Sequence, residues 1–144
     1  MTDPEPNTGL LLFYPYRALE SRVLAALGAA GFEITLAQAR LLQRLARDGS
    51  RVTELAAQAQ VTKQTAGALV DELERRGYVE RVPDPADGRA RLIRLAARGL
   101  EAVAIAAPVV AEVEAEWTEY LGEEAMAALR SALIRLRGIT DPWA

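Results

Sequence analysis

Hydrophobic side chains recur along most of this chain at intervals of three and four residues, which places them on one face of an α-helix. This period predicts helices over residues 10–30, 35–47, 53–59, 63–76, 96–120 and 122–137. In the last of these the inward positions are Met126, Leu129, Leu133 and Leu136. Thr35 with Gln38 has the pattern of a capping box for the second helix, and Thr62 can cap the fourth. A mainly α-helical fold follows.

The hydrophobic period changes to alternation after Gly77, where glycine commonly ends a helix. Residues 78–82 and 89–95 are predicted to be two strands, joined by a turn-rich loop over residues 83–88. Within that loop Asp87-Gly88 is a turn signal near the tip of the hairpin. One face of the second strand carries Arg89, Arg91, Ile93 and Leu95. The sequence therefore predicts a small β-hairpin beside the helices.

The predicted helix over residues 63–76 has one apolar and one polar face. Its apolar stripe is Ala66, Leu69, Val70 and Leu73. The opposite face carries Gln64, Ala68, Asp71 and Arg75, flanked by Lys63, Thr65 and Gly67. Two short helices with a tight link at Gln60-Val61, followed by a basic hairpin, make a winged helix-turn-helix. Because such a unit lays its second helix in the major groove of DNA, we expect residues 52–95 to form a DNA-binding head.

The formal net charge of −3 is opposite in sign to that expected of a DNA-binding protein, but the charge is unevenly distributed. Residues 40–98 hold twelve Lys and Arg against eight Asp and Glu, a net charge of +4. The rest of the chain holds five against twelve, a net charge of −7. The positive excess coincides with the predicted head, as expected of a phosphate-facing module within an acidic protein.

Composition narrows the range of functions. Hydrophobic residues make up 51% of the chain and aromatic residues 6%, which favours helix packing over a β-sandwich or barrel. The sequence has no cysteine, which excludes disulfides, thiolate metal sites and thiol redox sensing. It has no histidine, the commonest general base and zinc ligand, and no glycine-rich phosphate loop. We therefore expect no enzymatic activity, no cofactor and no metal site.

No segment is predicted to span a membrane, because the longest apolar stretch, residues 102–111, is short and contains Pro108. Residues 1–6 are acidic and rich in proline, unlike the basic start of a signal peptide. These two observations favour a cytoplasmic protein.

Five segments carry a more specific pattern. They are Leu36-Ala-Gln-Ala-Arg-Leu-Leu, Val52-Thr-Glu-Leu-Ala-Ala, Val61-Thr-Lys-Gln-Thr, Leu69-Val-Asp-Glu-Leu-Glu-Arg-Arg-Gly-Tyr-Val-Glu-Arg and Asp84-Pro-Ala-Asp-Gly-Arg-Ala-Arg-Leu-Ile-Arg-Leu. With them the chain resembles the MarR family of bacterial transcriptional regulators over almost its whole length, most specifically in the spacing from Leu73-Glu-Arg-Arg-Gly77 to Asp87 and Arg89. Two departures are Gly88, where the family often has an arginine, and Ala96, where a threonine N-cap is usual.

The resemblance implies a homodimer that binds double-stranded DNA. In the family the first helix and the last two helices form the dimer. Residues 1–33 would then hold a tail and a dimerisation helix, residues 34–98 the winged helix-turn-helix, and residues 99–144 the C-terminal dimerisation helices. The implied function is a ligand-responsive transcriptional regulator, usually a repressor, acting on a pseudo-palindromic operator.

The resemblance also assigns candidate DNA contacts. The major groove would receive Thr62, Lys63, Gln64, Thr65 and Ala68, with Arg75 on the same side of the helix. Arg89 would be the wing-tip arginine in the minor groove, and Arg91 a further contact to phosphate or the minor groove. Asp87 would brace the wing against a neighbouring arginine such as Arg91, although Asp-Gly also occurs in hairpin turns for backbone reasons alone.

Two alternatives stay open at the level of sequence. The aromatic residues Phe13, Tyr14, Tyr16 and Phe32 either line a pocket for a small aromatic or phenolic effector or pack in the core or the dimer interface. The net acidic charge and the wing with one arginine fewer also suit a winged-helix module that binds protein without reading DNA.

Overall fold

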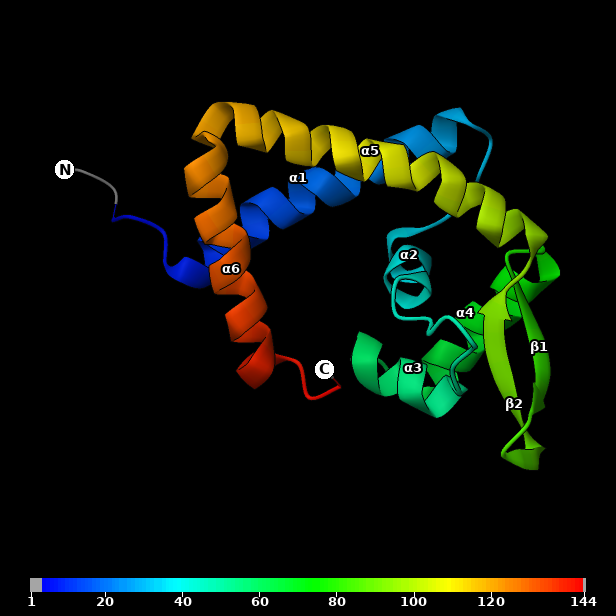
Figure 1. Ribbon diagram of the computed structural model, residues 1–144. Helices are drawn as coiled ribbons and strands as arrows, with labels where there is room; N and C mark the ends of the chain where they lie inside the picture. The colour runs from blue at the N-terminus through cyan, green and yellow to red at the C-terminus, as the bar shows by residue number, and fades with distance from the viewer. Residues whose placement is uncertain (1–3, 144) are drawn as a thin grey trace. The chain divides into compact units, whose positions relative to one another are not determined.

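The computed structural model describes residues 4–143. Its elements are α1 (Thr8–Ala29), α2 (Leu36–Leu42), α3 (Val52–Ala59), α4 (Lys63–Arg75), β1 (Val79–Asp84), β2 (Asp87–Leu95), α5 (Ala97–Leu121) and α6 (Glu123–Thr140) (Figure 1). The predicted fold class, mainly helical with one β-hairpin, is confirmed. The chain divides into a central unit, Leu27–Ala106, and a terminal unit made of the residues on either side of it. Both α1 and α5 contribute to both units.

One hydrophobic core holds the central unit together. It consists of Leu41, Leu55, Ala56, Ala66, Val70, Leu73, Tyr78, Val79 and Ile93. These residues come from α2, α3, α4, both strands and the link between α4 and β1, so the helices and the hairpin fold around the same apolar cluster. The predicted stripe of α4 is confirmed for Ala66, Val70 and Leu73, which are fully buried, while Leu69 is partly buried.

A tight turn joins α3 to α4. Gln60 ends α3 in the left-handed region with a φ of 56°, and its N–H donates to two carbonyls of the last turn. Thr62 begins α4, because its hydroxyl accepts the N–H of Thr65 at 3.0 Å. The caps predicted at Thr35 and Thr62 are both present. These local bonds fix where α4 begins and hence which side chains its first turn exposes.

The hairpin turns earlier than the sequence predicts. The register of β1 and β2 shifts between Pro83 and Asp84, and the strands turn back at Pro85-Ala86. The predicted turn at Asp87-Gly88 is wrong, because both residues lie in β2. The cause is the Asp84 carboxylate, whose Oδ1 accepts the N–H of Ala86 at 2.9 Å and closes the turn.

Helix α2 ends at Leu42 and not near residue 47 as predicted. Beyond it the N–H of Ala46 donates to the hydroxyl of Ser50 at 2.9 Å. Ser50 in turn exchanges both backbone hydrogen bonds with Ile93 of β2, at 2.9 and 2.8 Å. The chain thus pairs with the edge of the hairpin at Ser50. This pairing between distant segments ends α2.

Ion pairs link the three helices within the terminal unit. Arg22 of α1 forms a two-point ion pair with Glu116 of α5 and lies 3.5 Å from Glu112. Arg130 of α6 pairs with Glu114 of α5 at 3.3 Å. Three glutamates of α5 are therefore paired with arginines of α1 and α6.

The inward face predicted for α6 is mostly uncovered in the single chain. Of its four apolar positions only Met126 is buried. Leu129, Leu133 and Leu136 keep 37%, 40% and 42% of their surface exposed. The amphipathic pattern is present as predicted, but the described residues of one chain do not cover it.

Gly99, in the first turn of α5, lets this helix pack directly on the backbone that follows α4. A Cβ here would lie 2.1 Å from the carbonyl oxygen of Tyr78 and 2.9 Å from Cδ2 of Leu95. The same carbonyl accepts the N–H of Ala96 at 3.0 Å, which holds it in place. Any side chain at this position must force two backbone segments apart.

Gly99→Ala is expected to lower the free energy of unfolding by about 3 kcal/mol, since overpacking against fixed backbone is costly. Gly67→Ala is the matched control, because a Cβ there meets no atom within 4 Å and alanine favours helix by about 1 kcal/mol. Urea unfolding at one fixed protein concentration measures both variants. Equal stability of the two would contradict the close approach.

Candidate nucleic-acid interface

The first turn of α4 presents a continuous set of exposed side chains. Thr62, Lys63, Gln64 and Thr65 are all exposed, and so is Ala68 one turn further along. Thr62 is engaged locally, because its hydroxyl caps the Thr65 N–H and also contacts the Thr65 hydroxyl at 2.9 Å. Within residues 4–143, Lys63 and Gln64 have no side-chain partner. The turn therefore holds a cation and an amide available to a ligand.

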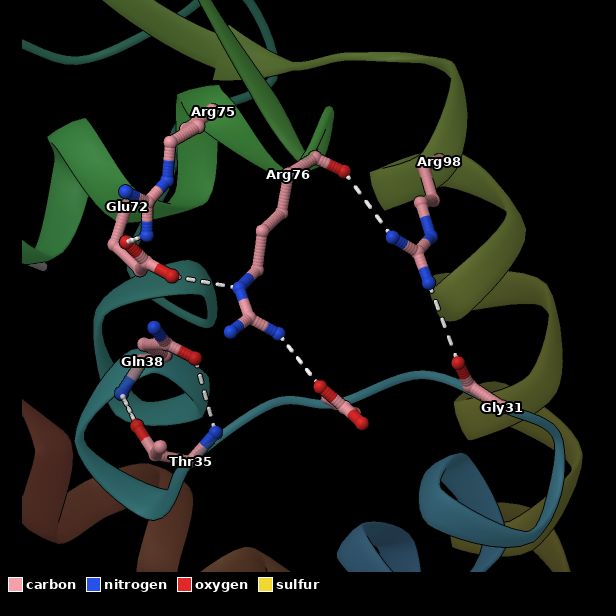
Figure 2. Close-up of polar contacts among 8 residues, drawn as sticks. Gly31, Thr35, Gln38, Glu72, Arg75, Arg76 and Arg98 are labelled. Atoms are coloured by element: carbon pink, nitrogen blue, oxygen red, sulfur yellow. Dashed lines mark hydrogen bonds and ion pairs between the residues drawn. The ribbon is translucent and has the colours of Figure 1, made fainter.

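Arg75, the predicted contact in the last turn of α4, is exposed but already paired. Its guanidinium forms an ion pair with Glu72, which also accepts Nε of Arg76 at 2.6 Å (Figure 2). Hydrogen bonds from Arg75 and Arg76 hold the pKa of Glu72 below its ordinary 4.5. The ion pair with Glu72 partly offsets the charge of Arg75 within its own helix.

Both wing arginines are exposed on β2, and among the described residues neither Arg89 nor Arg91 has a carboxylate partner. The bracing carboxylate is not the predicted one. Asp87 accepts the N–H of Arg89 at 3.1 Å and lies 3.9 Å from Arg51. Asp84 instead binds Arg51 closely, at 2.7 and 3.0 Å. The wing is thus braced from α3 and not by a pair within β2.

Other arginines of the central unit are neutralised by carboxylates. Arg81 of β1 pairs with Asp71 and Glu74 of α4, at 2.6 and 2.7 Å. Arg94 pairs with Glu80 across the hairpin at 2.6 Å. Since Asp71 lies on the polar face of α4, Arg81 offsets a negative charge that would otherwise repel a phosphate backbone.

Four cations of residues 27–106 are left without a carboxylate or carbonyl partner: Arg47, Lys63, Arg89 and Arg91. Three of them are predicted contacts. Arg47 was not predicted, since its only signal in the sequence is its place in the basic segment over residues 40–98. These unpaired cations, more than the total count, determine where the unit can hold phosphate.

Arg98, in the first turn of α5, connects the ends of three segments. Its guanidinium donates to the carbonyl of Arg76 at 3.3 Å and to the carbonyl of Gly31 at 3.2 Å (Figure 2). It also lies 4.8 Å from the ring centre of Tyr78 and 5.6 Å from that of Phe32. Because the last carbonyls of a helix lack helical partners, Arg98 satisfies an acceptor at the C-cap of α4, and its second bond holds the turn that follows α1. The C-terminal end of α4 is therefore fastened to α5.

The four aromatic candidates for an effector pocket belong to two different units. Phe13, Tyr14 and Tyr16 are exposed on α1 in the terminal unit. There the Arg17 guanidinium lies 5.3 and 5.7 Å from the ring centres of the first two. Phe32 lies in the central unit, packed against the core. Its packing against the core and against Arg98 gives Phe32 a structural role.

Residues 4–143 include no helix long and apolar enough to cross a membrane. The same residues contain no group of three or more acidic side chains placed to hold a metal ion. The candidate site consists of the exposed face of α4 together with the wing.

A helix-turn-helix with an exposed polar second helix and a cationic wing defines a winged-helix DNA-binding regulator. The family model described as the MarR family matches residues 32–90. A relative from Bacillus subtilis (strain 168), the uncharacterized HTH-type transcriptional regulator YdcH, is 31% identical over 116 residues, which cover 77% of this chain and 78% of the relative. The chain belongs to the MarR family, as its sequence pattern predicts.

Solved structures share the fold. The transcriptional repressor CouR bound to a 23-mer DNA duplex is 28% identical, with a TM-score of 0.67, covering 90% of this chain and 92% of that one. CouR comes from Rhodococcus jostii RHA1. NadR in complex with 4-hydroxyphenylacetate is 25% identical, with a TM-score of 0.70, covering 94% and 96%. The chain is accordingly a DNA-binding transcriptional regulator and not an enzyme.

Thr62→Ala is expected to lower the free energy of unfolding by about 1 kcal/mol, because the Thr65 N–H loses its cap. Thr62→Ser keeps the hydroxyl and should change stability little. Thr53→Ala is the control, an exposed threonine of α3 with no capping bond. Urea unfolding compares the three, and equal losses for the alanine and serine variants of Thr62 would contradict the cap.

Proposed function

We propose that the chain acts as a homodimeric, ligand-responsive repressor on a pseudo-palindromic operator. The observation that carries this proposal is the set of unpaired polar and cationic groups on α4 and the wing, namely Lys63, Gln64, Arg89 and Arg91. An α-helix fits the major groove, and cations on a hairpin suit phosphate or a narrow minor groove. The repressor CouR, which shares the fold, is bound to a DNA duplex and supports this function.

In this proposal α4 reads bases and the wing supplies charge. The residues facing the bases are Thr62, Lys63, Gln64, Thr65 and Ala68. Gln64 can bond adenine at two points, and Lys63 can donate to guanine. Arg89 enters the minor groove and Arg91 holds a phosphate. Arg75 makes a weaker contact, since it is shared with Glu72.

The exposed apolar side chains of the terminal helices support a homodimer. They include Leu10, Leu11, Leu12 and Phe13 of α1, Leu100 and Val103 of α5, and Leu133, Ile134 and Ile139 of α6. A monomer rarely leaves so many large apolar residues in water. We therefore propose that a second copy of the chain covers the apolar surface of residues 1–33 and 99–144. Two copies would present their α4 helices to half-sites about 34 Å apart, one turn of DNA.

Arg89→Ala is expected to weaken binding to the operator about ten-fold or more, because a minor-groove cation is lost from each half-site. The slope of log affinity against log salt should fall by about two, one counterion for each protomer. Fluorescence anisotropy at several salt concentrations measures both, using DNA from upstream of the gene that encodes the chain and a scrambled duplex of equal length.

Arg94→Ala is the matched control, because it removes the same charge from the same strand but from an arginine already paired with Glu80. Its affinity should stay within about threefold of wild type. If the wild-type protein binds both duplexes equally at moderate salt, or if the two variants bind alike, the proposed function is wrong.

The alternative is a winged-helix module that binds a protein, which the net charge of −3 favours. Gln64→Ala combined with Arg89→Ala separates the two functions. If the chain reads DNA, the double variant loses operator binding, while size-exclusion chromatography still shows a dimer. A protein-binding module would show no sequence preference for DNA even before substitution.

We further propose a small aromatic acid as the effector, acting near Phe13, Tyr14, Tyr16 or Phe32. NadR, which shares the fold, is bound to 4-hydroxyphenylacetate and supports this class of ligand. Such a ligand releases DNA only if it binds the DNA-incompetent dimer more tightly.

4-Hydroxyphenylacetate is expected to raise the melting temperature and to release labelled operator over the same concentration range. The matched control is 4-ethylphenol, which keeps the phenol and lacks the carboxylate. Release of the operator without any thermal shift, or no effect of the acid in either assay, would remove this ligand from consideration.

A further inference from the structure

The outer part of the wing has almost no hydrophobic support. Within residues 83–91 only Asp84 is buried, at 8% exposed, and only Ala90 is half-buried. A two-stranded hairpin without an apolar face is marginally stable in water. Yet this segment carries Arg89 and Arg91, whose position relative to α4 decides what they reach on DNA.

The buried carboxylate of Asp84 supplies the missing support. Its Oδ1 accepts the N–H of Ala86 at 2.9 Å, and its Oδ2 accepts Nε and Nη2 of Arg51 at 3.0 and 2.7 Å. The Ala86 N–H and the Arg51 guanidinium hold the pKa of Asp84 below its ordinary 3.8. The carboxylate therefore stays ionised to a lower pH than a free aspartate does, and the ion pair with Arg51 is lost only when acid protonates Asp84.

Arg51 lies outside the wing, at the N-cap position of α3, where its side chain makes no capping bond. The preceding residue, Ser50, pairs through its backbone with Ile93, nearer the base of the hairpin. Two consecutive residues thus hold the hairpin at two points, by backbone at Ser50 and by an ion pair at Arg51. Since α3 packs on α4 through the shared core, these bonds set the wing tip relative to α4.

We propose that Arg51 and Asp84 are positioning residues for DNA binding, whose ion pair holds the wing tip so that Arg89 reaches its contact. The DNA contact of Arg89 rests on the proposed function, whereas the hold on the wing can be measured without DNA. Both members of the pair serve one purpose, so removing either weakens binding. A purely electrostatic role predicts opposite effects, with loss of the negative Asp84 strengthening the attraction for phosphate.

The first test uses hydrogen exchange of the full-length protein without DNA. Asp84→Asn and Arg51→Gln should each speed exchange of the Arg89 amide at least about ten-fold, and leave the amides of α4 unchanged. Arg94→Gln is the matched control, since it breaks a different ion pair of the same hairpin. Unchanged exchange at the wing tip overturns the inference. If Asp84→Asn fails to fold, the Arg51→Gln variant alone tests the inference, because the Arg51 side chain is partly exposed and its replacement disturbs the core less.

The second test measures operator affinity. Asp84→Asn makes the protein more positive, yet it should bind about ten-fold more weakly, because a hydrogen-bonded charge pair is lost at the wing. Arg51→Lys keeps the net charge but lacks the planar fork that holds Asp84, so it should also weaken binding. Unchanged or tighter binding by Asp84→Asn overturns the inference.

A variant cycle tests whether the pair acts through the wing arginines. In a background that carries both Arg89→Ala and Arg91→Ala, adding Asp84→Asn should change affinity by no more than about twofold, because the segment that the ion pair holds carries both arginines. A full ten-fold loss of affinity in that background would show that the ion pair affects DNA binding independently of the wing arginines, and would overturn the inference. If the wild-type protein shows no sequence preference, the proposed function is wrong, while hydrogen exchange still decides whether Arg51 and Asp84 hold the wing.

Discussion

The position of α4 depends on one close contact, between the first turn of α5 and the backbone that leaves α4. Gly99 approaches the Tyr78 carbonyl so closely that a Cβ would lie 2.1 Å from it. Tyr78 is fully buried, and its hydroxyl has no partner among the described residues. The side chain is therefore held by its ring, packed in the core and lying 4.8 Å from the Arg98 guanidinium. This junction joins α4 to a helix that continues into the terminal unit.

The electrostatics of the central unit follow from pairing more than from the number of charges. Arg81 is shared by Asp71 and Glu74, and Arg51 pairs with Asp84, so the charge of these carboxylates is partly offset by arginines from neighbouring elements. The cations that remain unpaired among residues 27–106 are then Arg47, Lys63 and the two wing arginines. An acidic chain can bind a polyanion when its unpaired positive groups share one unit, since phosphate responds to the local field.

Most features that depend on neighbours in sequence were predictable, although the bond between Asp84 and the Ala86 N–H, which sets the hairpin turn, was not. The caps at Thr35 and Thr62, the buried stripe of α4 and the hairpin itself follow from spacing and from residue type. The end of α2 and the brace of the wing were not, because each depends on residues far apart in the chain, as with Ser50 and Ile93 or Arg51 and Asp84. For the candidate site, spacing identified exposed cations such as Arg89 but could not tell which arginines are already paired.

The attachments of α4 and of the wing are of different kinds, and this difference bears on how a signal would act. The wing is held by residues 50 and 51, which precede α3, while the end of α4 is held by Arg98 at the start of α5. A shift of α5 therefore acts on the junction at Arg98 and leaves the bonds between α3 and the wing intact. Since α3, α4 and the hairpin share one core, we expect these three elements to move together, so that in the proposed dimer a signal would change the spacing between the α4 helices of the two copies and not the shape of either core.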